Sequence, residues 1–259
     1  MPKWDPKDYE KSSSAQEIWA KELIKKLKLK GNERVLDIGC GDGKVTAELA
    51  RNVPFGSATG VDLSPDMIAY SKVKYIGQSN LSFEVGDASN LEYDREFDYV
   101  VSFACLHWIK DHVPVLKGIK RSLRPGGKIM LQFGGFGNAA ELFKVANDVI
   151  SENWKEYFVG FIFPYSFYSM EEYRIFLRRA GLKEVRLELV PKDRSDAGLE
   201  GIASFIRTTW QPYTDRVPEN KRKEFIGKIA DEYVRRHPLD SKGMAHIPMM
   251  RLEVEACAI

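Results

Sequence analysis

A short apolar run that ends in closely spaced glycines constrains this chain most. Residues 34–38 form the run, and Gly39, Gly41 and Gly43 follow at every second position. The run predicts a buried strand, and the glycines predict a tight turn. A helical pattern of apolar residues begins at Val45. Strand, glycine turn and helix together predict a loop that holds a nucleotide-type ligand.

Acidic side chains flank this loop and narrow the choice of ligand. Asp37 precedes the glycines, Asp42 lies among them, and Lys44 stands where a dinucleotide-binding loop has its third glycine. Both carboxylates are expected to repel a diphosphate, although helix starts attract phosphates in general. S-adenosylmethionine fits better, because it carries an ammonium, a sulfonium and hydroxyls but no phosphate. The alternative for the loop alone is an ordinary strand-to-helix turn.

The composition excludes several classes of protein. The 259 residues are 44% hydrophobic, which is enough for the core of one α/β domain. A net charge of +2 argues against a nucleic-acid surface built on bulk charge. The three cysteines are far apart, which suits a reducing compartment, and no spacing of His or Cys predicts a metal site. No apolar run has membrane-spanning length. We expect a cytoplasmic monomer or weak homodimer that binds neither nucleic acid nor membrane.

Three aspartates recur every 25 residues and mark the ends of successive strands. Asp37 ends the first strand, Asp62 ends the run 58–61, and Asp87 follows the run 81–85. This period is that of one strand–helix unit, so the strands are expected to be parallel and to end at one edge of a sheet. Ligands bind at that edge. One aspartate at a strand end is commonly a helix cap, but three on one period indicate a ligand site.

Each aspartate has an expected task toward S-adenosylmethionine. Asp62 is expected to accept from both ribose hydroxyls, because a carboxylate offers two acceptor oxygens. Asp87 is expected to accept from the adenine amino group beside the backbone of Ala88, and Asp37 to face the methionine end. Leu63 and Met67 are expected to sandwich the adenine, with plain core packing as the alternative for both.

Five motifs, in this order, resemble the class I S-adenosylmethionine-dependent methyltransferases. The resemblance implies an α/β fold with a Rossmann-like, mostly parallel sheet of seven strands, an antiparallel last strand and helices on both faces. It also implies cofactor contacts from Gly39, Cys40 and Gly41, and from Ala104 after the fourth strand. The motifs are Asp-Ile-Gly-Cys-Gly-Asp-Gly at 37–43, Val-Asp-Leu-Ser-Pro-Asp-Met at 61–67, Gly-Asp-Ala at 86–88, Phe-Asp-Tyr-Val-Val-Ser at 97–102 and Leu-Arg-Pro-Gly-Gly at 123–127.

The resemblance implies one methyltransferase domain over residues 1–259. Its N-terminal segment and helix, 1–30, are expected to lie over the cofactor, and its core, 31–135, to bind it. The rest comprises the fifth, sixth and seventh strands at 128–133, 184–190 and 252–257, and two helical cap inserts above the carboxyl edge at 136–168 and 191–247.

The flanks and the turn after the fourth strand resemble two different groups within this class. Residues 4–16, 205–213 and 248–252 are similar to trans-aconitate methyltransferases, whereas Cys-Leu-His-Trp at 105–108 is similar to juvenile hormone acid methyltransferases. Both groups methylate small carboxylic acids. The flanks imply cofactor contacts by Tyr9, Ser13 and Gln16 and substrate contacts by Trp4, Arg207 and Arg251. For both arginines a structural or surface role is the alternative, and for Trp4 and Tyr9 it is a hydrophobic staple.

We predict carboxylate O-methylation of a small molecule, with S-adenosylhomocysteine as the second product. Methyl transfer from a sulfonium is an in-line displacement, in which an enzyme mainly positions the reactants and excludes water. A carboxylate needs no base, since its unperturbed pKa of about 4 leaves it ionised at pH 7. His107 is expected to donate a hydrogen bond to this carboxylate, and Trp108 to form an aromatic wall.

Other activities remain open at this point. Methylation of a carbon, a nitrogen or a phenol oxygen would require His107 as a general base. A non-catalytic protein that binds S-adenosylmethionine would carry the same cofactor motifs. A nucleic-acid methyltransferase is disfavoured, because the chain has neither an Asn-Pro-Pro-Tyr-type tetrapeptide after the fourth strand nor a basic run. His107 itself has a packed turn residue as its alternative.

Overall fold

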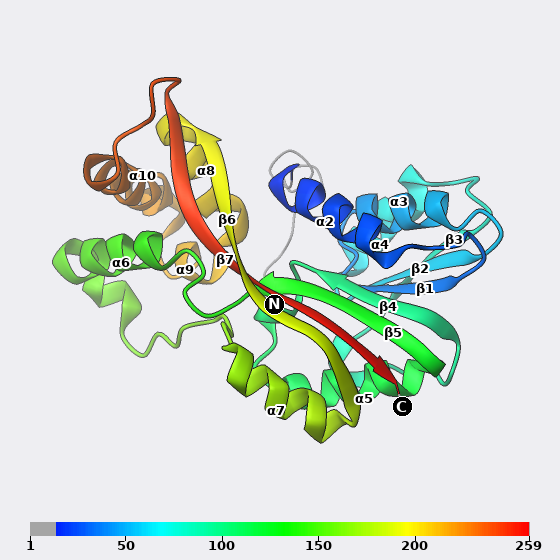
Figure 1. The fold of residues 1–259 in the computed structure, drawn as a ribbon. Coiled ribbons are helices and arrows are strands. Elements are labelled where there is room, and N and C mark those ends of the chain that lie inside the picture. Colours follow the sequence, from blue (N-terminus) through cyan, green and yellow to red (C-terminus); the bar gives the residue numbers. More distant parts are fainter. Residues whose placement is uncertain (1–13, 259) are drawn as a thin grey trace. The chain divides into compact units, whose positions relative to one another are not determined.

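The computed structural model describes residues 14–258, and over these residues it contains one sheet of seven strands. Their order is β3-β2-β1-β4-β5-β7-β6. Strands β1 to β5 pair in parallel, and β7 runs antiparallel to β5 (Figure 1), which confirms the predicted fold class. The bounds are β1 Arg34–Ile38, β2 Ser57–Asp62, β3 Leu81–Val85, β4 Phe97–Phe103, β5 Leu123–Gly134, β6 Leu182–Ala197 and β7 Met244–Ala258.

The chain divides into two compact units. The helical unit comprises Gly137–Pro164 and Pro191–Met250. The sheet unit comprises the described part of Trp4–Phe136, together with Tyr165–Val190 and Arg251–Ile259. Strands β6 and β7 each have one end in either unit, because the boundaries fall inside their ranges.

Helices cover both faces of the sheet in the sheet unit. Val35 packs with residues of α2 and α3, whereas Leu36 and Ile38 pack with residues of α5 and α7. Because both faces are covered, β1 is apolar at successive positions. Each fully buried aliphatic side chain contributes about 1.5–3 kcal/mol to folding. One face carries α2 Ser14–Leu27, α3 Lys44–Asn52 and α4 Pro65–Lys74, and the other carries α5 His112–Ser122 and α7 Met170–Ala180 (Figure 1).

The helical unit has an aromatic core of its own. Phe143 stacks on Trp210 with ring centroids 4.2 Å apart and 5° between the planes. Phe225 and Tyr233 of the longest helix are fully buried, so they anchor it in this unit. The elements are α6 Ala140–Val149, the π-helix Ile150–Trp154, the short helix Lys155–Phe158, α8 Gly198–Thr209, α9 Gln211–Thr214 and α10 Glu219–Arg236.

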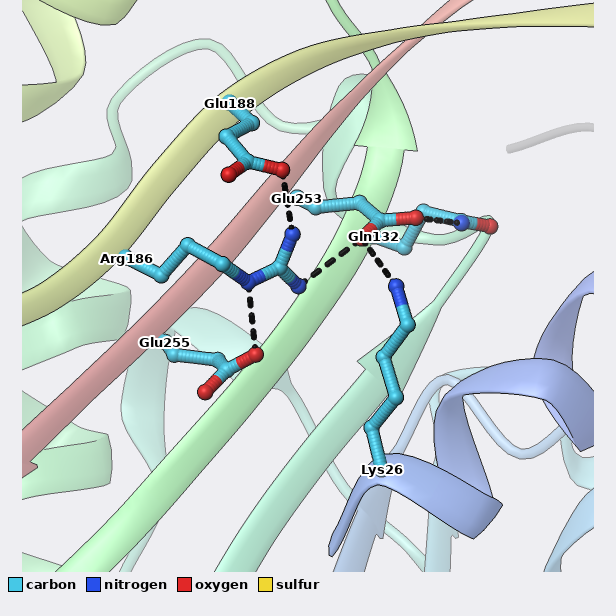
Figure 2. Close-up of polar contacts among 6 residues, drawn as sticks. All are labelled: Lys26, Gln132, Arg186, Glu188, Glu253 and Glu255. Atoms are coloured by element: carbon cyan, nitrogen blue, oxygen red, sulfur yellow. Dashed lines mark hydrogen bonds and ion pairs between the residues drawn. The ribbon is translucent and has the colours of Figure 1, made fainter.

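A buried carboxylate on β7 ties α2 and β6 to the sheet. Glu253 is 2% exposed and accepts hydrogen bonds from Arg186 of β6 at 2.8 Å, Lys26 of α2 at 3.1 Å and Gln132 of β5 at 2.9 Å. Figure 2 shows these donors converging on it from three elements. Burial raises the pKa of Glu253, but the three donors outweigh burial and hold it below its usual value. The network thereby fixes the part of β7 that also carries Arg251, two residues away on the same face.

The sequence underestimated the length of three strands. The sixth strand was expected to end at Val190, but Pro191 lies inside β6. Because β6 is the last strand in the sheet order, a missing N–H is tolerated there. Strand β7 begins eight residues before the predicted start at Leu252, so the insert 191–247 is not helical at its ends. Strand β5 begins at Leu123, which pairs with Phe97 ahead of a register shift.

The described residues contain neither a membrane-spanning helix nor a metal-binding cluster. No helix among them is both long and apolar enough to cross a bilayer. Within the same residues, no three His, Cys, Asp or Glu side chains gather in an arrangement that would hold an ion. The three cysteines are free thiols, and two of them, Cys40 and Cys105, lie next to the glycine turn.

Candidate active site

The glycine turn after β1 packs against the turn after β4. Gly39 adopts φ +74°, and a Cβ added there would lie 2.2 Å from Sγ of Cys105. A residue with a side chain is therefore excluded by both the backbone and the space. The N–H groups of Gly39 and Cys40 donate to the carbonyl of Val61 at 2.8 and 3.0 Å. These contacts hold the glycine turn against the end of β2.

Asp37 is a buried carboxyl group whose pKa lies near neutrality. It is 2% exposed, and its Oδ2 accepts from the hydroxyl of Thr46 on α3 at 2.7 Å. Burial raises the pKa of Asp37 to about 7; the Thr46 hydrogen bond opposes this, and the charge of Asp62 adds to it. Thr46, which has no exposed surface, was not identified from the sequence.

Asp62 bridges the glycine turn and the start of α4. Its Oδ2 accepts from the N–H of Gly41 at 3.0 Å, and its Oδ1 accepts from the N–H of Ser64 at 2.9 Å. Burial raises the pKa of Asp62 in spite of these backbone hydrogen bonds. A carboxylate offers about four acceptor sites, so Asp62 retains capacity to accept from a ligand.

Asp37 and Asp62 together form an acidic pair, whereas Asp42 does not belong to it. Asp42 is 4% exposed, and its Oδ2 lies 3.5 Å from Nζ of Lys44 and 3.6 Å from Nζ of Lys74. The two lysines offset its charge, so repulsion of a diphosphate is now expected from Asp37 and not from Asp42. The pKa values of Asp37 and Asp62 are both raised, which means that a bound cation would stabilise their charged forms.

The residues that are predicted to bind the adenine differ in solvent exposure. Asp87 follows β3 and is exposed; its Oδ1 accepts from the N–H of Ser89 at 2.8 Å, so it caps the short helix Ala88–Asn90. Leu63 is 42% exposed, which leaves its side chain available to a ligand. Met67 is 3% exposed and is largely covered by protein. The adenine-binding role stays a prediction for all of them.

The turn after β4 carries His107 and Trp108, the residues that are predicted to bind the methyl acceptor. Ala104 adopts φ +58°, which is rare for a residue with a side chain and common at functional sites. Its N–H donates to the carbonyl of Gln132 on β5 at 2.7 Å. The short helix Leu106–Trp108 follows and places His107 and Trp108 beyond the carboxyl end of β4.

His107 is neutral, and its proton lies on Nε2. The backbone N–H of Gly134, at the end of β5, donates to Nδ1 of His107 at 3.4 Å. Burial lowers the pKa of His107 well below its usual value, and the charge of Arg251 and the neighbouring His112 lower it further. Because Nδ1 accepts and the ring is uncharged, Nε2 must carry the hydrogen and is a donor.

Arg251 places a buried positive charge beside this histidine. It lies opposite Gly134 in the register of β5 and β7, and it is 3% exposed. Its guanidinium lies 5.5 Å from the ring centre of Trp19 on α2. The structure therefore brings together His107 and Arg251, which are 144 positions apart in the sequence.

Aromatic side chains surround the His107 turn. Trp108 and Tyr165 pack edge to face with centroids 4.8 Å apart, and Tyr165 and Phe167 are stacked at 5.6 Å. The N–H of Ser166 donates to the carbonyl of His107 at 2.8 Å. The segment 165–167 thus packs against the His107 turn, and the role of Trp108 as an aromatic wall beside the acceptor stays a prediction.

The predicted roles of five further residues stay predictions. Trp4, Tyr9 and Ser13 lie outside the described residues, as does the side chain of Gln16 on α2. Arg207 is exposed on α8 in the helical unit, where its guanidinium donates to the hydroxyl of Ser204 at 3.4 Å.

Comparison with known proteins returns methyltransferases. Residues 35–127 match the family described as a methyltransferase domain. A trans-aconitate 2-methyltransferase of Methylobacterium nodulans is 27% identical, over 97% of this chain and 97% of that protein. A demethylmenaquinone methyltransferase of Lactobacillus johnsonii is 35% identical, over 61% of this chain and 63% of that protein. A solved structure of phosphoethanolamine N-methyltransferase 2 from Haemonchus contortus, in complex with S-adenosyl-L-methionine, has the same fold. Its TM-score is 0.60 at 20% identity, over 98% of this chain and 56% of that chain.

Proposed function

The chain belongs to the class I S-adenosylmethionine-dependent methyltransferases, and from this premise we propose that it O-methylates the carboxylate of a small organic acid. The single observation that carries the choice of acceptor is the state of His107. Its Nδ1 accepts from the N–H of Gly134, so its Nε2–H is a donor and no free lone pair of the ring remains to act as a base.

The acidic pair suits the cofactor. S-adenosylmethionine, when bound, supplies an electrophilic methyl group on a cationic sulfur. Asp62 would hold the ribose hydroxyls through its remaining lone pairs, and Asp37 would face the ammonium of the methionine end. Asp87 and the backbone of Ala88 would bind the adenine. Burial of Asp37 and Asp62 favours a cationic ligand, because a cation restores the charged form that burial penalises.

The His107 turn suits an anionic acceptor. The Nε2–H of His107 would donate to one carboxylate oxygen, and the guanidinium of Arg251 would pair with the same carboxylate or a second one. A carboxylic acid of ordinary pKa, about 4, is ionised at pH 7 and is already a nucleophile. Trp108 would wall the site and exclude water. The turn thus orients the acceptor without having to remove a proton from it.

Methylation of a carbon, nitrogen or phenol is disfavoured by the same residue. Such acceptors give up a proton, and a positioned base contributes about 10²–10⁴-fold to the rate. A base is most effective when its pKa lies near the working pH, whereas burial holds that of His107 well below its usual value. The relative named for trans-aconitate favours an acid, while the one named for demethylmenaquinone keeps carbon as the alternative.

The test is the chemical nature of the methylated product. The protein is incubated with S-adenosylmethionine labelled in its methyl group and with matched panels of carboxylic acids, phenols and amines. We expect label in the acids and its complete release under mild base, as an ester requires. Label that withstands mild base, in a product from the phenol or amine panel, would contradict the proposal.

A further inference from the structure

A second histidine holds the turn that carries His107. His112, the first residue of α5, has no exposed surface, and its ring folds back over the preceding turn. Its Nε2 lies 2.8 Å from the carbonyl of Leu106 and 3.1 Å from the carbonyl of Ile109. These two carbonyls lie on either side of the pair His107 and Trp108. His112 therefore holds the backbone of residues 106–109 by hydrogen bonds on both sides of His107 and Trp108.

The hydrogen-bond partners determine the proton position on His112. A carbonyl only accepts, so Nε2 of His112 carries the hydrogen and donates to both carbonyls. Its Nδ1 then accepts, and the hydroxyl of Tyr173 on α7 lies 3.3 Å away as the donor. Burial lowers the pKa of His112 to about 4, against the hydrogen bonds to Leu106 and Ile109, so this neutral form persists at neutral pH.

His112 also contacts the strand that supplies the donor to His107. Its ring packs edge to face on Phe133 with centroids 5.3 Å apart, and Phe133 directly precedes Gly134. The same histidine thus touches both sides of the Gly134–His107 hydrogen bond: the turn through two carbonyls, and β5 through Phe133. A shift of the ring would move one side relative to the other.

We propose that His112, with its proton position set by the two carbonyls at Nε2 and the Tyr173 hydroxyl at Nδ1, is a positioning residue that keeps Nε2–H of His107 directed at the methyl acceptor. That the Nε2–H of His107 meets the acceptor rests on the proposed function. The effect of His112 on the proton position of His107 does not rest on it. The two hydrogen bonds from His112 fix the backbone of residues 106–109, and the Gly134 N–H then fixes the tautomer of His107. His112 itself touches no reactant.

Four variants separate this role from simple packing. His112→Phe keeps a ring but removes the single donor to both carbonyls of the turn, and His112→Gln restores an N–H near the position of Nε2. Phe176→Leu is the matched control, because Phe176 packs on the rings of His112, Tyr168 and Tyr173 and makes none of these hydrogen bonds. Tyr173→Phe is the milder variant, should His112→Phe fold poorly, since it removes the donor to Nδ1 alone.

The kinetic readout is kcat/KM for the acceptor against the dissociation constant for S-adenosylmethionine. We expect His112→Phe to lower kcat/KM by about 10- to 100-fold, the scale for a misplaced reacting group, and to leave cofactor affinity within about twofold. His112→Gln should recover most of the loss. Phe176→Leu should lose stability without this kinetic loss. Equal kinetic losses in His112→Phe and Phe176→Leu would reduce His112 to a packing residue and overturn the proposal.

A spectroscopic readout keeps the test independent of the acceptor. In the protein without ligands, nitrogen chemical shifts of the His107 ring report which nitrogen carries the proton. We expect protonated Nε2 in the wild type and a mixture of tautomers in His112→Phe and Tyr173→Phe. An unchanged His107 spectrum in both variants would overturn the proposal. If no carboxylic acid is methylated but the spectra change as expected, the proposed function fails while the positioning role of His112 stands.

Discussion

The two halves of the sheet edge differ in charge. The ends of β1 and β2 carry two carboxyl groups, the buried Asp37 and the half-buried Asp62, whose pKa values are raised by desolvation. The turn after β4 and the neighbouring part of β7 carry a neutral histidine donor and a buried guanidinium, His107 and Arg251. We call the first the acidic half, which suits a cation, and the second the basic half, which suits an anion. Under the proposed function this edge would place a sulfonium next to a carboxylate, so substitutions in each half should affect one ligand only.

The largest effect is expected in the acidic half, from loss of the ribose contact. Asp62→Ala removes a charged hydrogen-bond acceptor, worth about 1.5–3 kcal/mol, so affinity for S-adenosylmethionine should fall roughly 10- to 150-fold. Calorimetry measures the change, and a thermal melt checks that the protein remains folded. The acceptor KM, extrapolated to saturating cofactor, should stay the same. Undiminished cofactor affinity would remove Asp62 from the cofactor site.

The next effect belongs to the basic half. Arg251→Met removes the buried guanidinium at similar volume, and the acceptor KM should rise by roughly 10- to 100-fold, the range for a charge-assisted contact. Arg251→Lys keeps the charge but not the fork of donors, and it should recover the loss in part. Arg207→Met, on the exposed face of α8, serves as the control. A larger loss in Arg207→Met than in Arg251→Met would reverse the assignment of these two residues.

A smaller effect concerns pH and the cofactor alone. Asp37 has a pKa of about 7 without ligands, so it is largely protonated below that pH. A bound ammonium favours the carboxylate, and affinity for S-adenosylmethionine should therefore fall as the pH drops, by up to tenfold per unit between about pH 7 and 5.5. Asp37→Asn retains an acceptor for Thr46 and should abolish the slope. Wild-type affinity that does not vary over this range would contradict a contact between Asp37 and the ammonium.

The acidic half was more predictable than the basic half, because its signals are local. The 25-residue period placed Asp37 and Asp62 at strand ends, and the parallel sheet then aligned those ends. Thr46 was missed, since its contact with Asp37 depends on how α3 docks on the sheet. The neighbourhood of Asp42 was misjudged for a similar reason: Lys74 reaches it from α4, 32 residues away.

The basic half depends on contacts between distant parts of the chain. The motif at 105–108 identified His107 as a candidate, but its proton position follows from Gly134, through the pairing of β4 with β5. Arg251 comes into register with Gly134 only through the antiparallel pairing of β7. A histidine of ordinary pKa that acts as a base would lose rate below about pH 6.5. This pH signature is not expected of His107, because the pKa of this half-buried histidine lies well below that value.

The central claim is that His107 donates a hydrogen bond to a carboxylate, and a pair of substitutions tests it most directly. His107→Gln retains a donor, and its kcat/KM on one confirmed acceptor should stay within about fivefold of the wild type; His107→Ala should lose about 1–3 kcal/mol of transition-state stabilisation. If His107 were a base, both variants would lose on the order of 10²–10⁴-fold, because glutamine takes no proton. An active Gln variant with normal cofactor affinity is the predicted result, and an inactive Gln variant that still binds the cofactor would contradict the account.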